Sequence, residues 1–213
     1  VVKVFGWMAA GLMLTAIISL FTVSSPALLE LIFSRSYVYF ALFIAQLGLV
    51  VWLSARIAKM SAMTATLVFL GYSALTGLTL AVVFLAYTAS SIASTFFVTG
   101  GMFGAMCAYG YVTKRDLTGM GSFMMMGLIG VVLASVVNMF MHNETIYWIT
   151  TFIGIIIFVG LTAYDTQKIK AMSQVALEGS EEEQKGAIIG ALRLYLDFIN
   201  LFLLLLRVLG RRK

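Results

Sequence analysis

Seven long apolar runs dominate this sequence and limit what it can fold into. Each has about the 20 residues that an α-helix needs to cross the hydrocarbon core of a bilayer. They occupy residues 4–23, 37–55, 62–87, 90–112, 121–141, 146–164 and 186–206. The runs are continuous rather than alternating, which excludes the strands of a membrane barrel. We therefore predict an all-α integral membrane protein, a seven-transmembrane-helix bundle with a single transmembrane domain over 1–213.

The composition supports this class and excludes several functions. The chain is 62% hydrophobic and 11% charged, whereas a soluble domain is roughly 45–50% apolar and about 25% charged. One cysteine, Cys107, and one histidine, His142, exclude an intrachain disulfide and the usual Cys or His metal sites. The longest polar stretch, Lys168 to Gly186, is predicted to be a loop. We expect the lipid bilayer as its surroundings, no nucleic-acid partner and no bound cofactor, and the oligomeric state stays unknown.

Basic residues gather in alternate connections between the runs. The second, fourth and sixth connections and the N-terminal end carry Lys3, Arg56, Lys59, Lys114, Arg115, Lys168 and Lys170. The positive-inside rule therefore places the N-terminus in the cytoplasm. Seven crossings would place the chain's end outside, yet the tail from Arg211 to Lys213 is basic. We expect a last helix buried inside the bundle, and leave the side of the tail open.

Three charged residues interrupt the apolar runs: Asp165, Arg193 and Asp197. A charge inside a membrane helix is costly and is a functional hypothesis by default. Arg193 and Asp197 are four positions apart and share one helix face, so a purely structural ion pair is one interpretation. For Asp165 the structural interpretation is a helix-end carboxylate, exposed to water and paired with Lys168 or Lys170.

A functional interpretation joins the two aspartates, which lie on the spans that flank the last connection. Two carboxylates in contact cannot both ionise cheaply, so they would share a proton and form a pH-sensitive pair beside a weak calcium site. Contact requires that the last helix begin near Ile188 or Leu192, or be displaced along the membrane normal.

Small residues at helical spacing predict close helix packing. The fourth span carries Gly100, Gly101, Gly104 and Ala108, and such faces let two backbones approach each other. The prediction for this stripe is helix packing rather than chemistry.

Two segments carry a family resemblance: Leu161-Thr-Ala-Tyr-Asp-Thr-Gln-Lys-Ile-Lys170 and Ala191-Leu-Arg-Leu-Tyr-Leu-Asp-Phe-Ile-Asn-Leu-Phe-Leu203. With Thr76-Gly-Leu-Thr79 and the number of spans, they resemble the Bax inhibitor-1 (transmembrane Bax inhibitor motif) family, in its bacterial YccA-like branch. The resemblance covers the whole chain.

The resemblance implies a central C-terminal helix and a pH-sensitive calcium leak in the bacterial inner (cytoplasmic) membrane. It implies that Asp165 and Asp197 form the latching pair, with Arg56 as the candidate for the competing arginine. Arg193 is, by its spacing, the supporting ion-pair partner of Asp197. Some members carry an acid in the second span, where this chain has Gln46, which argues against strong calcium selectivity. The resemblance also implies a link to the membrane-bound AAA protease system.

Four function classes remain to be compared. A passive cation leak is the first, and an interaction protein that modulates membrane-protein quality control or stress survival is the second. An intramembrane aspartyl protease would need one aspartate on each of two helices, but its glycines are missing before Asp197 and the sole proline is Pro26. A proton-coupled transporter usually shows inverted repeats, and none is visible. We therefore predict a leak that is not an enzyme.

Overall fold

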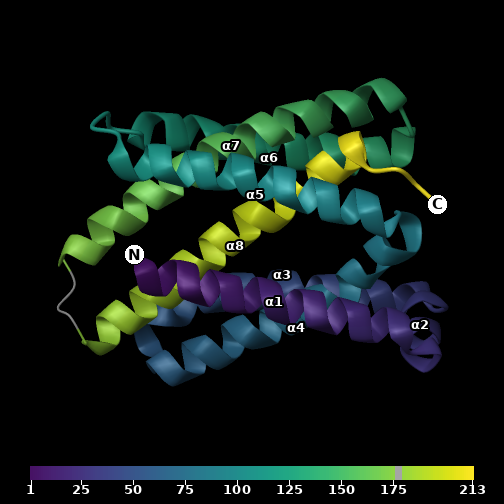
Figure 1. The fold of residues 1–213 in the computed structure, drawn as a ribbon, viewed down its shortest axis with the longest axis horizontal. Helices are drawn as coiled ribbons and strands as arrows, with labels where there is room; N and C mark the ends of the chain where they lie inside the picture. The colour runs from purple at the N-terminus through teal and green to yellow at the C-terminus, as the bar shows by residue number, and fades with distance from the viewer. Residues whose placement is uncertain (176–178) are drawn as a thin grey trace. The chain divides into compact units, whose positions relative to one another are not determined.

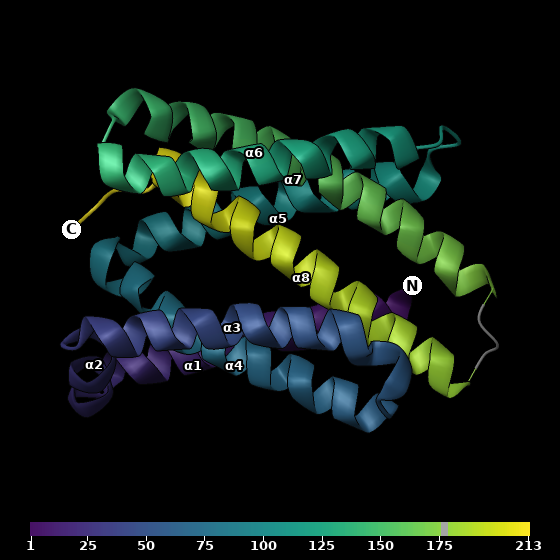
Figure 2. The same ribbon diagram turned by 180° about the vertical axis from the view of Figure 1, so that it is seen from behind.

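The computed structural model describes residues 1–175 and 179–213, and the elements in these ranges are helical (Figure 1, Figure 2). They are α1 (Val2–Ser24), α2 (Pro26–Phe33), α3 (Ser36–Arg56), the 3-10 turn η1 (Ile57–Lys59), α4 (Ala62–Ala86), α5 (Ala89–Val112), α6 (Thr118–Met141), α7 (Glu144–Val175) and α8 (Glu181–Leu209). In this part of the chain, seven helices are long and apolar enough to cross a membrane. The predicted all-α membrane fold is confirmed.

The short helix α2 was not predicted. Ser25 adopts an extended conformation and separates α1 from α2, and Pro26 then occupies the first turn of α2. Proline is tolerated there because the first N–H groups of a helix have no partner within the helix. The predicted break at Pro26 is therefore confirmed, but the chain resumes a helix immediately after it.

The predicted loop from Lys168 to Gly186 is wrong for most of its length. Helix α7 continues to Val175 and α8 already begins at Glu181. The Ser180 hydroxyl accepts a hydrogen bond from the Glu183 N–H at 3.1 Å, and the Glu183 carboxylate accepts one from the Gly179 N–H at 2.7 Å. This reciprocal cap begins a helix, and acidic residues in the first turn favour it. A later start near Ile188 or Leu192, one of the two conditions considered for contact between the aspartates, is therefore not found.

The chain divides into two compact units. Unit 1 comprises 1–89, 172–195 and 212–213, and unit 2 comprises 90–171 and 196–211. Helix α8 contributes its residues up to Tyr195 to unit 1 and those from Leu196 to unit 2. It is also the most buried of the seven spans, with 61% of its apolar window buried. The high burial agrees with the prediction of a buried last helix, whereas its place inside the bundle, its central position and the single domain stay predictions.

In unit 1, the backbones of α1 and α4 approach closely at Gly77. A Cβ atom on Gly77 would lie 2.7 Å from the Ile18 Cβ and 2.8 Å from the Thr15 carbonyl oxygen. The close approach lets the Ser19 hydroxyl donate to the Gly77 carbonyl at 2.8 Å, and the Thr15 hydroxyl donate to the Ser73 carbonyl at 2.9 Å. Small and hydroxyl side chains therefore join these two spans, as is common in membranes.

Unit 2 packs around an apolar core contributed by α7 and α8. Its buried members are Ile157, Phe158, Leu161, Leu201 and Leu205. Helices α6 and α7 run side by side in both views (Figure 1, Figure 2), and the Gly121 backbone lies against the Tyr164 ring.

The predicted small-residue stripe does not provide the close contact of α5. Gly100, Gly101 and Gly104 face open space among the described residues, whereas Gly110 lies directly against the Ala163 backbone of α7. The prediction is wrong about these three glycines. The stripe repeats at helical spacing, but spacing alone does not say which face of a helix meets a neighbour.

Contacts within unit 1 place the two ends of the described chain near opposite ends of α4. Near the start of α8, Glu183 pairs with Lys3 of α1 at 2.9 Å, and Glu181 accepts the N–H of Ala62, the first residue of α4. At the chain's other end, Lys213 donates through its N–H to the Ala86 carbonyl at 3.0 Å, beside the end of α4. Within unit 1, Lys213 therefore lies near the end of α4 that is opposite to Ala62.

Candidate functional site

Asp165 and Asp197 are buried in the interiors of their helices, and both lie in unit 2. Asp165 is 7% exposed to solvent, and Asp197 is 5% exposed. Because α7 continues to Val175, Asp165 does not lie at a helix end. The interpretation of Asp165 as an exposed helix-end carboxylate is wrong.

A small polar cluster from three helices lies beside Asp197. The buried Cys107 thiol of α5 lies against the Thr166 side chain of α7 and within Coulombic reach of the Asp197 carboxylate of α8. Thr166 directly follows Asp165, and its hydroxyl donates to the Thr162 carbonyl at 2.8 Å. The cluster therefore brings α5, α7 and α8 together around ionisable groups. Direct sharing of a proton between the two carboxylates stays a prediction.

Aromatic rings contact α8 at Phe198, the residue that follows Asp197. The ring centroid of Phe198 lies 5.4 Å from that of Phe96 and 5.3 Å from that of Phe103. These rings place apolar side chains beside the Asp197 turn.

The two predicted arginines lie in unit 1. Arg56 is exposed in the last turn of α3, and Arg193 is half-buried in the part of α8 that belongs to unit 1. Their roles as latch and ion-pair partner stay predictions.

Gln46, at the position where some relatives are expected to carry an acid, has a structural role. Its side chain is 8% exposed, and its amide donates to the Leu75 carbonyl at 3.1 Å and to the Thr79 hydroxyl at 3.0 Å. The amide therefore joins α3 to α4 in unit 1.

Sequence reasoning missed a buried hydroxyl network in unit 1. The Tyr195 hydroxyl lies 2.6 Å from the Thr15 hydroxyl, and Tyr195 is fully buried. Its ring meets Phe69 and Tyr72 edge-on, at centroid distances of 5.9 and 5.8 Å. The available signal was the presence of hydroxyl residues such as Thr15 at internal positions of apolar spans.

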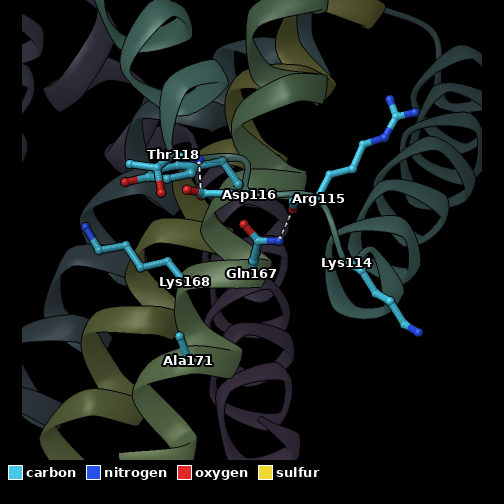
Figure 3. Close-up of a pocket in the computed structure, with 8 residues that line it drawn as sticks. Lys114, Arg115, Asp116, Thr118, Gln167, Lys168 and Ala171 are labelled. Carbon is cyan, nitrogen blue, oxygen red and sulfur yellow. Dashed lines mark hydrogen bonds between the residues drawn. The ribbon is translucent and has the colours of Figure 1, made fainter.

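A second polar feature is an open pocket of about 550 Å³ at the N-terminal end of α6 (Figure 3). It is lined by Lys114, Arg115, Asp116, Thr118, Tyr164, Gln167, Lys168 and Ala171, which we call the basic pocket. Gln167 of α7 fixes the connection beside it: its amide oxygen accepts from the Leu117 N–H at 2.9 Å, and its amide nitrogen donates to the Arg115 carbonyl at 2.8 Å.

The described residues offer no group of three or more His, Cys, Asp or Glu side chains that could hold a metal ion. Calcium prefers six to eight oxygen ligands. Two carboxylates, from Asp165 and Asp197, could therefore attract a passing cation but would hold calcium weakly by themselves.

The structure defines a multi-pass α-helical membrane protein with buried ionisable residues. Its described part has seven spans, a last helix that is buried for most of its length, and carboxylates enclosed in two spans. A sequence model of the family described as "Inhibitor of apoptosis-promoting Bax1" matches residues 1–213. The chain belongs to the Bax inhibitor-1 family, which confirms the resemblance.

Several relatives share almost the full length of the chain. It is 55% identical to the inner membrane protein YbhL of Escherichia coli K12 over 212 residues, which cover 99% of this chain and 91% of that protein. It is 46% identical to a protein of Borreliella burgdorferi over 211 residues, covering 99% and 91% of the two chains. A membrane protein of Streptococcus pyogenes serotype M1 is 34% identical over 211 residues, covering 98% and 91%. These names and the seven apolar helices support the prediction of a multi-pass inner membrane protein.

Proposed function

We propose that this protein is a passive, pH-sensitive cation leak of the bacterial inner membrane, with calcium as the permeant ion and no catalysed reaction. The observation that carries the proposal is the burial of Asp165 and Asp197 in one unit, on consecutive spans, each less than one-tenth exposed. Membrane proteins rarely keep two enclosed carboxylates without a use for their charge, because each ionised group is costly in apolar surroundings.

Protonation changes what such a pair can do. When both carboxylates are ionised, they repel each other and attract a cation. When they share a proton, a hydrogen bond replaces the repulsion and the attraction for a cation falls. A change of bulk pH therefore alters both the packing of α7 against α8 and the electrostatic field along the ion's route.

The half-buried Arg193 and the exposed Arg56 enter the proposal as secondary groups. Arg193 precedes Asp197 by one helical turn, so its positive charge can favour the ionised carboxylate. Arg56 is the candidate for the arginine that competes for one of the aspartates. Replacing either arginine by Gln should shift the pH at which flux changes without removing the response.

The test is calcium flux into proteoliposomes at about pH 6 and about pH 8. Wild type is compared with Asp165→Asn and Asp197→Asn, which keep the shape of each side chain and remove its titration. The matched control is Asp116→Asn, since Asp116 is the remaining aspartate and is exposed in the connection between α5 and α6. We expect a pH-dependent flux in wild type and in the control, and no pH response in the two buried variants.

Two results would contradict the proposal. An unchanged pH response in folded Asp197→Asn would reject the aspartate pair as the gate. Absence of flux from every folded sample would reject the leak itself. It would favour an interaction protein in membrane quality control, for which binding to the membrane-bound AAA protease complex would be the next measurement.

A further inference from the structure

The basic pocket is rich in cations. Three of its four charged side chains are Lys114, Arg115 and Lys168, and all three residues are exposed. The single acid, Asp116, is already engaged: its carboxylate accepts a hydrogen bond from the Thr118 N–H at 2.9 Å. This hydrogen bonding holds the pKa of the Asp116 carboxyl below its usual value of 3.8. The acid therefore stays ionised at neutral pH, and the pocket keeps a net positive charge.

The framework of the pocket is fixed, while its cations are long and adaptable. Gln167 uses both atoms of its amide to hold the backbone of the connection on α7. Figure 3 shows the Lys168 ammonium on one side of Asp116 and Thr118, and the Arg115 and Lys114 side chains extending on the other side. A ligand that reaches cations on both sides must be larger than a single small anion.

The position of the pocket along the spans suggests its occupant. It lies where α5 has ended at Val112 and where α6 begins at Thr118, and both helices are long enough to span the bilayer. The ends of such helices lie at the level of the lipid headgroups. Phosphates of anionic lipids are concentrated at that level, and basic pockets between transmembrane helices recognise them by charge.

We propose that the basic pocket binds the phosphate-bearing headgroup of an anionic phospholipid. Arg115 can present two parallel N–H groups to a phosphate, and Lys168 supplies a compact charge on the opposite side. The volume of about 550 Å³ accommodates a headgroup with its glycerol rather than phosphate alone. The proposal does not depend on cation flux. The occupant would, however, contact the helix that carries Asp165, because Tyr164, Gln167 and Lys168 line the pocket.

The test is native mass spectrometry of the full chain released from nanodiscs that contain equal amounts of phosphatidylcholine and phosphatidylglycerol. The pocket variant Arg115→Gln/Lys168→Gln is compared with the control Arg56→Gln/Lys59→Gln, which removes the same charge from exposed residues outside the pocket. We expect wild type and control to retain the anionic lipid preferentially. The pocket variant should lose affinity by about fivefold for each cation removed. Inorganic phosphate, added as a competitor, should not displace the lipid.

Three outcomes would overturn the proposal. An equal loss of bound anionic lipid from the pocket variant and the control variant would mean that only overall charge attracts the lipid. Equal retention of both lipids by folded wild type would mean that no anionic headgroup is selected. If inorganic phosphate displaced the lipid and occupied the pocket to a similar extent, the pocket would be assigned to a free anion. Thermal unfolding of each variant establishes that the compared samples are folded.

Discussion

The Tyr195 hydroxyl and the Thr15 hydroxyl lie 2.6 Å apart in the interior of unit 1, where they join α8 to α1. The Thr15 hydroxyl also lies 2.9 Å from the carbonyl oxygens of Gly11 and Ser73. This contact joins the part of α8 in unit 1 both to α1 and, through Thr15, to the Ser73 carbonyl of α4. The network therefore ties the part of α8 in unit 1 to α1, whereas Asp197 belongs to unit 2.

Replacing Tyr195 by Phe should destabilise the protein modestly. The change removes one buried interhelical hydrogen bond and keeps the ring against Phe69 and Tyr72. Such bonds in membrane proteins contribute about 0.6 kcal/mol on average and up to about 1.7 kcal/mol. Unfolding in a denaturing detergent series measures the loss. Tyr111→Phe is the control, because Tyr111 is exposed and should tolerate the change; an equal effect of both substitutions would contradict a specific role for the network.

Replacing Gly110 by Ala should damage unit 2 more severely. The added methyl group would overlap the Ala163 carbonyl group, which belongs to a helix backbone and cannot rotate away. Overpacking of this kind costs roughly 1–3 kcal/mol and displaces α5 from α7. The control is Gly104→Ala on the same helix, where the methyl group meets open space. The measurement is the thermal midpoint, and equal midpoints for the two variants would show that this close approach is not needed.

The stabilising contribution of Asp116 should depend on pH. Hydrogen bonds from Thr118 lower the pKa of Asp116 in the folded protein below the usual 3.8. A carboxyl whose pKa is lower in the folded than in the unfolded protein contributes its full stabilisation at a pH above the unfolded-state pKa. This contribution is lost as the pH falls through the folded-state pKa. The difference in thermal midpoint between wild type and Asp116→Ala should therefore be constant at neutral pH and narrow below about pH 4. A difference that widens on acidification would contradict this account.

The two ends of the described chain should react with a membrane-impermeant thiol reagent from opposite sides. Single cysteines are introduced by Lys3→Cys or Lys213→Cys in a Cys107→Ala background, since Cys107 is the sole native cysteine. With the N-terminus in the cytoplasm, intact right-side-out vesicles should label only at position 213. Labelling of both variants from one side would contradict seven crossings. The reversed pattern would keep the crossings and overturn the predicted orientation.

Much of the fold could be predicted from the sequence, because the hydrocarbon core of the bilayer offers the backbone no hydrogen-bond partners. Every backbone N–H and C=O in the bilayer must find a partner within the chain, so a continuous apolar run of sufficient length becomes a helix. Five of the seven predicted spans agree with α1, α3, α4, α5 and α6 to within a few residues. The last two were predicted too short, because charged residues from Lys168 onward were read as loop. The cap from Ser180 to Glu183 was the overlooked signal.

The candidate site could be predicted from the sequence only in part. The sequence identified Asp165 and Asp197 because charge is rare in such spans, and both are buried as a functional carboxylate in a membrane would be. It did not identify the partners that surround them. Cys107 and Thr166 are unremarkable in composition, and only the packing of α5, α7 and α8 brings their side chains together.

The sequence by itself determined the membrane class, the number of spans and the positions of the buried charges, because hydrophobicity and length act locally along the chain. The tertiary structure decided which glycines bring helices together, as Gly110 does and Gly104 does not. It also decided that the tail lies at the far end of α4 from Lys3, through the contact of Lys213 with Ala86. These features depend on which faces of distant helices meet, and that choice is made by close packing between segments far apart in the sequence.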